Sequence, residues 1–177
     1  MGDPQESYDL LLDDFSDTAG VSAVGTRWEG FTDQVMGGVS QMQAGVEPTD
    51  AGAALHMSGR VSLENNGGFI QTRLRLAESG TFDAGDYTGI ALVVRGTGDH
   101  YYLHLRTPRT MFPWAHFAAP LPVAGEWRRV EVPFSSFEAK YMMGGRLDRS
   151  RLRSVAVVAG QAAFDADIYV RSVGLYR

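Results

Sequence analysis

Side chains that alternate between apolar and polar recur along this chain, and a helical repeat of apolar residues is almost absent. The clearest example is GFIQTRLRL at 68–76. Successive side chains of a β-strand point to opposite faces, so this segment is expected to form a strand with two different faces. One face carries Ile70, Thr72, Leu74 and Leu76, and the other carries Phe69, Gln71, Arg73 and Arg75.

Further strands are expected wherever an apolar or alternating run is bounded by Gly, Pro, Asp or Asn. Within 133–142 we expect one short helical turn, with Ser135 or Ser136 as its cap. Many strands without interleaved helices predict an all-β fold, an antiparallel β-sandwich. The length suits a single domain, 1–177, with its core from about residue 8 onward. The other expected strands fall at 54–63, 89–96, 101–107, 127–134, 152–160 and 167–176.

The composition argues against several kinds of protein. There is no Cys in the sequence, which excludes disulfides, thiolate metal sites and cysteine nucleophiles. The net charge of −5 argues against nucleic-acid binding. The apolar runs are too short for membrane insertion, and the acidic stretch MGDPQESYDLLLDDF resembles neither a signal peptide nor a transit peptide. We therefore expect a cytoplasmic protein.

No motif in the sequence indicates a reaction or a cofactor. GVSQM at 38–42 lacks the second glycine of a nucleophile elbow. GTGDHY at 96–101 lacks the third glycine and the following helix of a dinucleotide site. His100 and His104 share a face of one expected strand but lie too far apart to bind one metal ion. The remaining histidines are expected to stand alone: His56 and His116.

Two acidic clusters are calcium candidates. Asp13 and Asp14 fall in the first expected strand, and Asp165 and Asp167 enter the last one. If these end strands are neighbours, their carboxylates and nearby carbonyls offer the hard oxygen ligands that Ca²⁺ requires. The alternative is solvated acids at strand ends. The principal candidates for calcium are Asp14 and Asp167.

Two glycine turns, FTDQVMGGVSQ at 31–41 and ENNGGF at 64–69, repeat the same chemistry. Glycine permits a left-handed backbone or a close approach of two chains, and Asp or Asn can hold a turn by accepting backbone N–H groups. We expect the turns to meet at one end of the sandwich, with Asp33 and Asn66 fixing them. The alternative is tight turns with no binding role. The candidate site residues are Asp33, Met36, Gly37, Gly38, Ser40, Asn65, Asn66, Gly67 and Gly68.

A polar strand face forms the second candidate site. The polar side of 68–76 and the matching side of YYLHLRT at 101–107 are expected to lie on one surface. Aromatic and arginine side chains of this kind suit a protein interface or a sugar site. The alternative is that they pack at the edge of the sandwich. The candidates are Gln71, Arg73, Arg75, Tyr102, His104, Arg106, Trp114 and His116.

Four ordered segments resemble motifs of the complex I intermediate-associated protein family, the thirty-kilodalton class of NADH:ubiquinone oxidoreductase assembly factor. The resemblance runs from about residue 12 to the C-terminus, and it implies a galactose-binding-like β-sandwich, or jelly roll. Met57 departs from the family, which commonly has an aromatic residue there. The richness in Ala, Gly, Arg and Asp favours a bacterial member. The segments are WEGFTDQVMGGVSQ (28–41), MSGRVSLENNGGF (57–69), YTGIALVVRGTGDHYYLHLR (87–106) and WRRVEVPFSSF (127–137).

The resemblance implies a non-enzymatic assembly factor or chaperone. Its partners would be polypeptides such as complex I subunits or assembly intermediates. A galactose-binding-like sandwich also suits a carbohydrate or small-molecule binding module, for which the partner is a glycan. An enzyme is the third interpretation, because a site can assemble in space without a sequence motif. The sequence leaves these three open.

Overall fold

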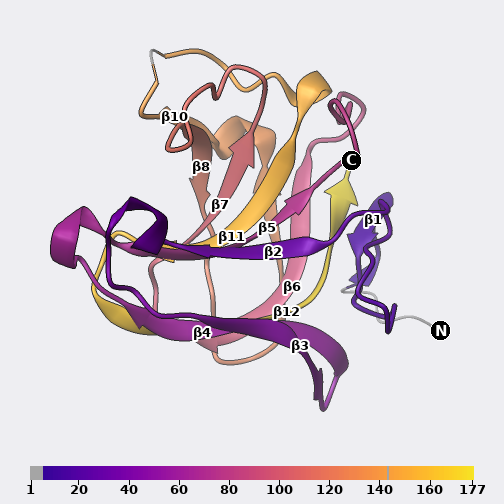
Figure 1. Ribbon diagram of the computed structural model, residues 1–177. Coiled ribbons are helices and arrows are strands. Elements are labelled where there is room, and N and C mark those ends of the chain that lie inside the picture. Colours follow the sequence, from indigo (N-terminus) through magenta and orange to yellow (C-terminus); the bar gives the residue numbers. More distant parts are fainter. Residues whose placement is uncertain (1–5, 143) are drawn as a thin grey trace.

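The structure is a computed structural model that describes residues 6–142 and 144–177, without the side chain of Asn66. In these residues two antiparallel sheets of six strands pack face to face (Figure 1). The first sheet has the order β3 (Gln43–Thr49), β4 (Gly52–Val61), β12 (Phe164–Tyr176), β6 (Gly89–Thr97) and β9 (Arg128–Pro133), with β1 (Leu10–Asp13) also paired to β12. The second has the order β10 (Glu138–Lys140), β8 (His116–Pro120), β7 (Tyr101–Arg106), β11 (Ser154–Gly160), β5 (Phe69–Arg75) and β2 (Trp28–Thr32).

The core lies between the sheets, where each strand contributes every second side chain. In β5 the predicted apolar face is buried, and the face with Gln71 and Arg73 points outward. In β7 the same alternation buries Leu103 and Leu105. The predicted antiparallel sandwich and the division of these two strands into faces are therefore confirmed.

Two central strands are buried along nearly their whole length. In β6 all residues from Gly89 to Val94 are buried, and in β11 all seven residues are. Central strands read as near-continuous apolar runs because both faces are covered. The outer side chains of β11 are small, and the longer side chains of β5 and β7 cover them from either side.

Short connections replace true helices in the described residues. They are the 3₁₀ turns η2 (Asp33–Met36), η3 (Glu64–Asn66), η4 (Phe134–Ser136) and η5 (Arg149–Arg151). The expected helical turn within 133–142 exists as η4, but the predicted serine cap is wrong. The residue at the cap position is Pro133, and no side chain caps the turn, because the chain leaves β9 in an extended conformation there. Residues 138–140 then form strand β10 instead of helix.

Candidate functional site

The two glycine turns meet at Asp33, whose carboxylate is fully buried at the start of η2. This carboxylate accepts hydrogen bonds from the N–H of Ser40 at 3.0 Å and from the Ser40 hydroxyl at 2.5 Å. From the second turn it accepts the N–H groups of Gly68 at 2.6 Å and Phe69 at 3.4 Å. The Ser40 oxygen also accepts the N–H of Ser62 at 2.9 Å. One carboxylate therefore ties η2 to the chain that enters β5.

The Asp33 carboxylate is ionised and saturated with donors. Burial alone would raise its pKa, but the hydrogen bonds from Ser40, Gly68 and Phe69 lower the pKa below its ordinary value. An acceptor engaged in this way has little capacity left for proton transfer. The geometry supports a structural role for the carboxylate, which locks the two turns together.

Some of the other candidate residues of the two turns pack against Asp33, and others lie exposed on the surface. Gly67 packs against Asp33, since a Cβ atom there would lie 2.4 Å from Oδ2. Met36 and Asn65 are exposed, and Asn65 has a left-handed backbone with φ of 56°. The prediction that Asn66 also fixes the loops concerns a side chain outside the described part of the chain.

Gly37 and Gly38 are required for different reasons. Gly37 caps η2 with a left-handed φ of 88°. Gly38 provides close approach, because a Cβ atom there would lie 2.4 Å from Cγ of Asp33. The conformational freedom of glycine is thus used at Gly37, and its small size is used at Gly38.

Replacing Gly38 by Val is expected to lower the free energy of unfolding by about 2 kcal/mol, because the new side chain overlaps the Asp33 carboxylate. For a chain of this length the melting temperature should fall by about 4–8 °C. Gly45→Val is the matched control, since nothing lies within 4 Å of a Cβ atom at that exposed position of β3. Thermal unfolding of Gly38→Val, Gly45→Val and wild type gives the melting temperatures to be compared. If both variants melt alike, the close packing at Gly38 has no energetic importance.

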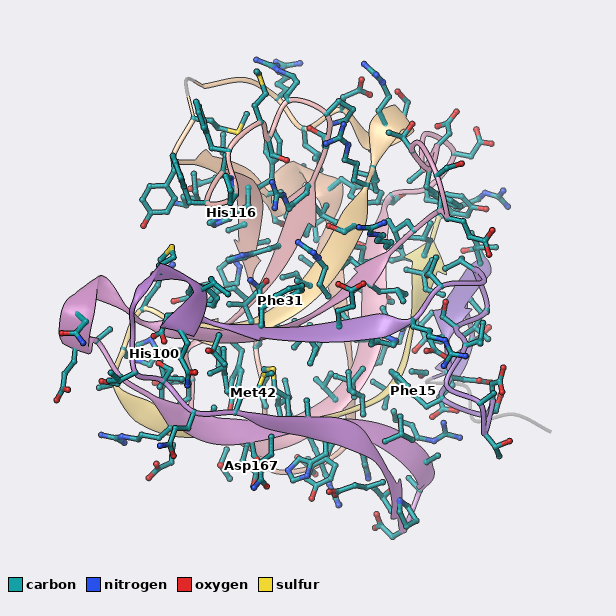
Figure 2. The ribbon with its side chains drawn as sticks, in the orientation of Figure 1. Phe15, Phe31, Met42, His100, His116 and Asp167 are labelled. Atoms are coloured by element: carbon teal, nitrogen blue, oxygen red, sulfur yellow. The ribbon has the colours of Figure 1, made fainter. Side chains whose placement is uncertain are left out.

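The second candidate set assembles on the outer face of the second sheet. Pairing of β11 with its neighbours places its small outer residues between long side chains of β5 and β7. Three rows cross this face: Arg75, Ser154 and Arg106; Arg73, Ala156 and His104; Gln71, Val158 and Tyr102. The expected shared surface is therefore present in the structure. His116 continues it on β8, and Figure 2 shows His116 and Phe31 on this sheet.

Two histidines stack on this face. The rings of His104 and His116 are nearly parallel, with centroids 3.8 Å apart. Burial lowers the pKa of His104 to about 3, and His116 adds a smaller effect in the same direction. Burial also lowers the pKa of His116, although its hydrogen bond to the Trp114 carbonyl acts in the opposite direction. Both rings are therefore neutral near pH 7.

The predictions that His56 and His116 stand alone are wrong. His56 has Nδ1 3.0 Å from Glu47 Oε2 and Nε2 2.7 Å from Asp167 Oδ1, and its ring stacks on Tyr169 with centroids 4.0 Å apart. Strand pairing brings together side chains that are remote in the sequence.

An aromatic cluster stands at the end of this face, in the loop between β7 and β8 and just after β10. The guanidinium of Arg106 donates to the carbonyl oxygens of Thr110 at 3.1 Å and Phe112 at 3.0 Å, which fixes the loop. Phe112 and Trp114 stack with centroids 5.1 Å apart, and they are 55% and 52% exposed. Tyr141 is 74% exposed, 5.9 Å from the His116 ring between centroids. We name Phe112, Trp114, His116 and Tyr141 the aromatic cluster.

Of these four residues, Trp114 and His116 were predicted from the sequence, whereas Phe112 and Tyr141 were not. Tyr141 also has a left-handed backbone with φ of 56°, which is uncommon for a bulky residue. Strained backbone of this kind is found most often at functional sites. The sequence does contain a signal for Phe112. The apolar pair at 111–112 follows an expected strand, with Pro108 before it and Pro113 directly after it.

The two acidic clusters do not come together. Asp13 of β1 pairs with Val173, six residues from Asp167 along β12, which corresponds to about 20 Å. Asp13 accepts the N–H of Phe15 at 2.9 Å, and Asp14 accepts that of Ser16 at 3.1 Å. Figure 2 shows Asp167 on the outer side of the first sheet, away from Phe15.

The described residues contain neither a metal-binding cluster nor a membrane-spanning helix. In 6–142 and 144–177, no group of three or more His, Cys, Asp or Glu is arranged to hold a metal ion. Within the same ranges, no helix has the length and apolar character needed to cross a membrane.

Several solved structures of other proteins have a similar fold. The family 11 carbohydrate-binding module of the cellulase Lic26A-Cel5E from Clostridium thermocellum superimposes with a TM-score of 0.74 at 16% identity, over 96% of this chain and 95% of that one. The same type of module in complex with a β-1,3-1,4-mixed-linked tetrasaccharide gives 0.72 at 16% identity, over 94% of each chain. A family 30 carbohydrate-binding module gives 0.65 at 12% identity, over 96% and 89%. The chain thus has the galactose-binding-like jelly-roll fold.

Comparison with curated proteins found no match. The family model for complex I intermediate-associated protein 30 matches residues 14–165, which include both glycine turns and the outer face of the second sheet. Since the match spans most of the chain, this protein belongs to the complex I intermediate-associated protein 30 (CIA30) family.

Proposed function

We propose that this chain is a non-enzymatic protein-interaction module that holds a partner polypeptide on the outer face of the second sheet. The observation that carries the proposal is the exposed aromatic cluster beside the arginines of β5 and β7. Trp, Tyr and Arg dominate the binding energy of protein interfaces, and aromatic side chains that are more than half exposed contribute little to the packing of the core.

The loop geometry supports a preformed binding surface. Arg106 fixes the loop that carries Phe112 and Trp114, and the two rings are already stacked in the free chain. Ordering a loop in advance removes part of the entropy that binding would otherwise cost. Tyr141, held in a left-handed backbone, adds a third exposed ring to the same end of the face.

The family supports a role in assembly. Its model is named for a protein associated with a complex I intermediate. We therefore infer that the chain assists the assembly of a multisubunit complex such as NADH:ubiquinone oxidoreductase, with its subunits or assembly intermediates as partners. The bacterial cytoplasm remains the predicted location.

Affinity purification of the tagged chain from its source organism tests the proposal. We expect complex I subunits or assembly intermediates to co-elute with wild type and to be lost with the double variant Phe112→Ser/Trp114→Ser. Each such residue at an interface centre contributes about 2 kcal/mol, so binding should weaken at least about 30-fold. Val46→Ser, at a 51% exposed apolar side chain on β3, is the matched control.

Two results would contradict the proposal. One is a wild-type chain that elutes without any complex I component. The other is retention by Phe112→Ser/Trp114→Ser combined with loss by Met36→Ser, which would move the interface to the exposed part of the locked turns.

Carbohydrate binding is the alternative function. It is favoured by one observation, that a module of the same fold is known in complex with a mixed-linked tetrasaccharide. Stacked, exposed Phe112 and Trp114 also offer flat apolar surfaces to a sugar ring. Titration with mixed-linked β-glucan tetrasaccharide separates the two functions. Saturable binding that Phe112→Ser/Trp114→Ser abolishes would support the sugar, and no binding would remove it.

A further inference from the structure

Five arginines surround one pocket at the end of the second sheet. The pocket has a volume of about 630 Å³ and lies where β5 and β7 end beside the start of β11. Three of these arginines are site candidates predicted from the sequence, whereas Arg151 and Arg153, which flank the buried Leu152, were not predicted. We name the five the arginine pocket: Arg73, Arg75, Arg106, Arg151 and Arg153.

The positive charge of this pocket is only partly neutralised by the protein. Glu78 is the one acidic side chain among the described residues that line it. Arg73 has a partner outside the pocket, Glu29, at 3.8 Å. In residues 6–142 and 144–177, no ion pair forms with Arg75 or Arg153. Five positive groups thus gather on a chain whose net charge is −5.

The guanidinium groups also repel one another. Burial lowers the pKa of Arg106, and the nearby charges of Arg73 and Arg153 lower it further. Like charges in one site raise the free energy of the folded chain, and an anion that enters the site removes this repulsion.

A hydroxyl opens onto the same pocket. Ser154 lines the pocket and stands in register between Arg75 and Arg106. The Cα atoms of Arg75 and Arg106 lie about 10 Å apart, since adjacent strands are separated by 4.7–4.9 Å. Among the described side chains, none hydrogen-bonds to the Ser154 hydroxyl, which is open to the pocket. A ligand oxygen at the pocket floor can therefore accept a hydrogen bond from this hydroxyl.

We propose that the arginine pocket binds a small phosphorylated compound that carries at least two negative charges. Arginine presents donors in a planar fork that matches phosphate oxygens, and the pocket contains arginine only, without lysine. A single carboxylate would neutralise one of the five charges, whereas a phosphate dianion or a diphosphate neutralises two or more. The volume of about 630 Å³ lies within the range of small-molecule sites, so there is room for an organic group beside the phosphate.

Isothermal titration with inorganic pyrophosphate at pH 7.5 and fixed ionic strength tests the proposal. We expect saturable binding of one pyrophosphate per chain. The double variant Arg75→Gln/Arg153→Gln should weaken binding at least tenfold, since it removes two unpaired guanidinium groups. Ser154→Ala should weaken it about fivefold, in line with loss of one hydrogen bond. Both arginines are exposed, so the double variant should fold normally, which circular dichroism checks.

The matched control is Arg60→Gln/Arg128→Gln, which changes the net charge equally at exposed positions on the first sheet. Unchanged affinity in this control supports the pocket. Equal weakening in both double variants would show attraction to overall charge only and would overturn the proposal. So would the absence of saturable binding at millimolar pyrophosphate, or binding of citrate as tight as that of pyrophosphate. None of the variants in the partner test changes a residue of the arginine pocket, so pyrophosphate binding and partner binding can fail independently.

Discussion

Replacing Asp33 by Asn lowers the free energy of unfolding by an expected 3–4 kcal/mol, a large part of the roughly 5–15 kcal/mol that stabilises a typical domain. The carboxylate is fully buried and accepts donors from Ser40, Gly68 and Phe69. An amide in its place has one acceptor oxygen and an NH₂ group that faces N–H donors. At least one buried donor then lacks an acceptor, and the remaining hydrogen bonds lose the contribution of the negative charge.

Denaturant unfolding of Asp33→Asn and wild type gives the free-energy difference. Asp83→Asn is the matched control, because Asp83 is exposed and accepts one local hydrogen bond, from the N–H of Gly85 at 2.8 Å, which Asn can also accept. We expect the control to stay within about 0.5 kcal/mol of wild type. An Asp33→Asn variant as stable as wild type would mean that the carboxylate does not hold the two turns together.

Much of the fold could be predicted from the sequence because the alternating strands have one covered face each. In β5 and β7 the pattern of apolar and polar residues alone identifies the strand and the side that packs inward. The meeting of the glycine turns could also be anticipated, since Asp33 and the Gly67–Gly68 pair have the chemistry of a shared turn. The need for a glycine at Gly38 could not be predicted from the sequence, because the close contact of Gly38 with Asp33 depends on how η2 folds back.

Strands β2, β3, β8 and β10 were not predicted. The edge strand β3 is exposed along most of its length and contains Pro48, which is tolerated at a sheet edge. A strand of this kind has no covered face and therefore no periodic pattern. Strand β10 has three residues and follows a turn, so it is too short to show a periodic pattern.

Strand register decides which residues come together at the site, and register cannot be predicted from a local sequence pattern. The stacking of His104 on His116 follows from the pairing of β7 with β8. Arg153 joins Arg75 and Arg106 because the chain enters β11 between β5 and β7. A polar face could be predicted from the sequence, whereas the positive pocket and the exposed aromatic cluster at the end of this face depend on the three-dimensional arrangement.

Acid should destabilise the wild-type chain through His104. Its pKa is lowered to about 3 in the folded chain by burial and by His116, and an unfolded histidine has a pKa of about 6.5. Below pH 6.5 the unfolded chain therefore binds a proton that the folded chain does not, so stability falls as the pH falls. From pH 8 to pH 4.5 the expected loss is about 2.7 kcal/mol, since each pH unit below 6.5 contributes about 1.36 kcal/mol.

His104→Gln removes this titration, so its stability should vary by about 2.7 kcal/mol less than that of wild type over the same range. Denaturant unfolding at half-unit pH intervals measures both curves. The control is His100→Gln, because His100 has an exposed side chain beside Asp99 and should leave the wild-type curve unchanged. Arg106 and Lys140 keep the region positive in every variant, so they do not generate the difference. If the curves of His104→Gln and wild type coincide, His104 becomes protonated in the folded chain, and the stacked pair with His116 is not neutral as inferred.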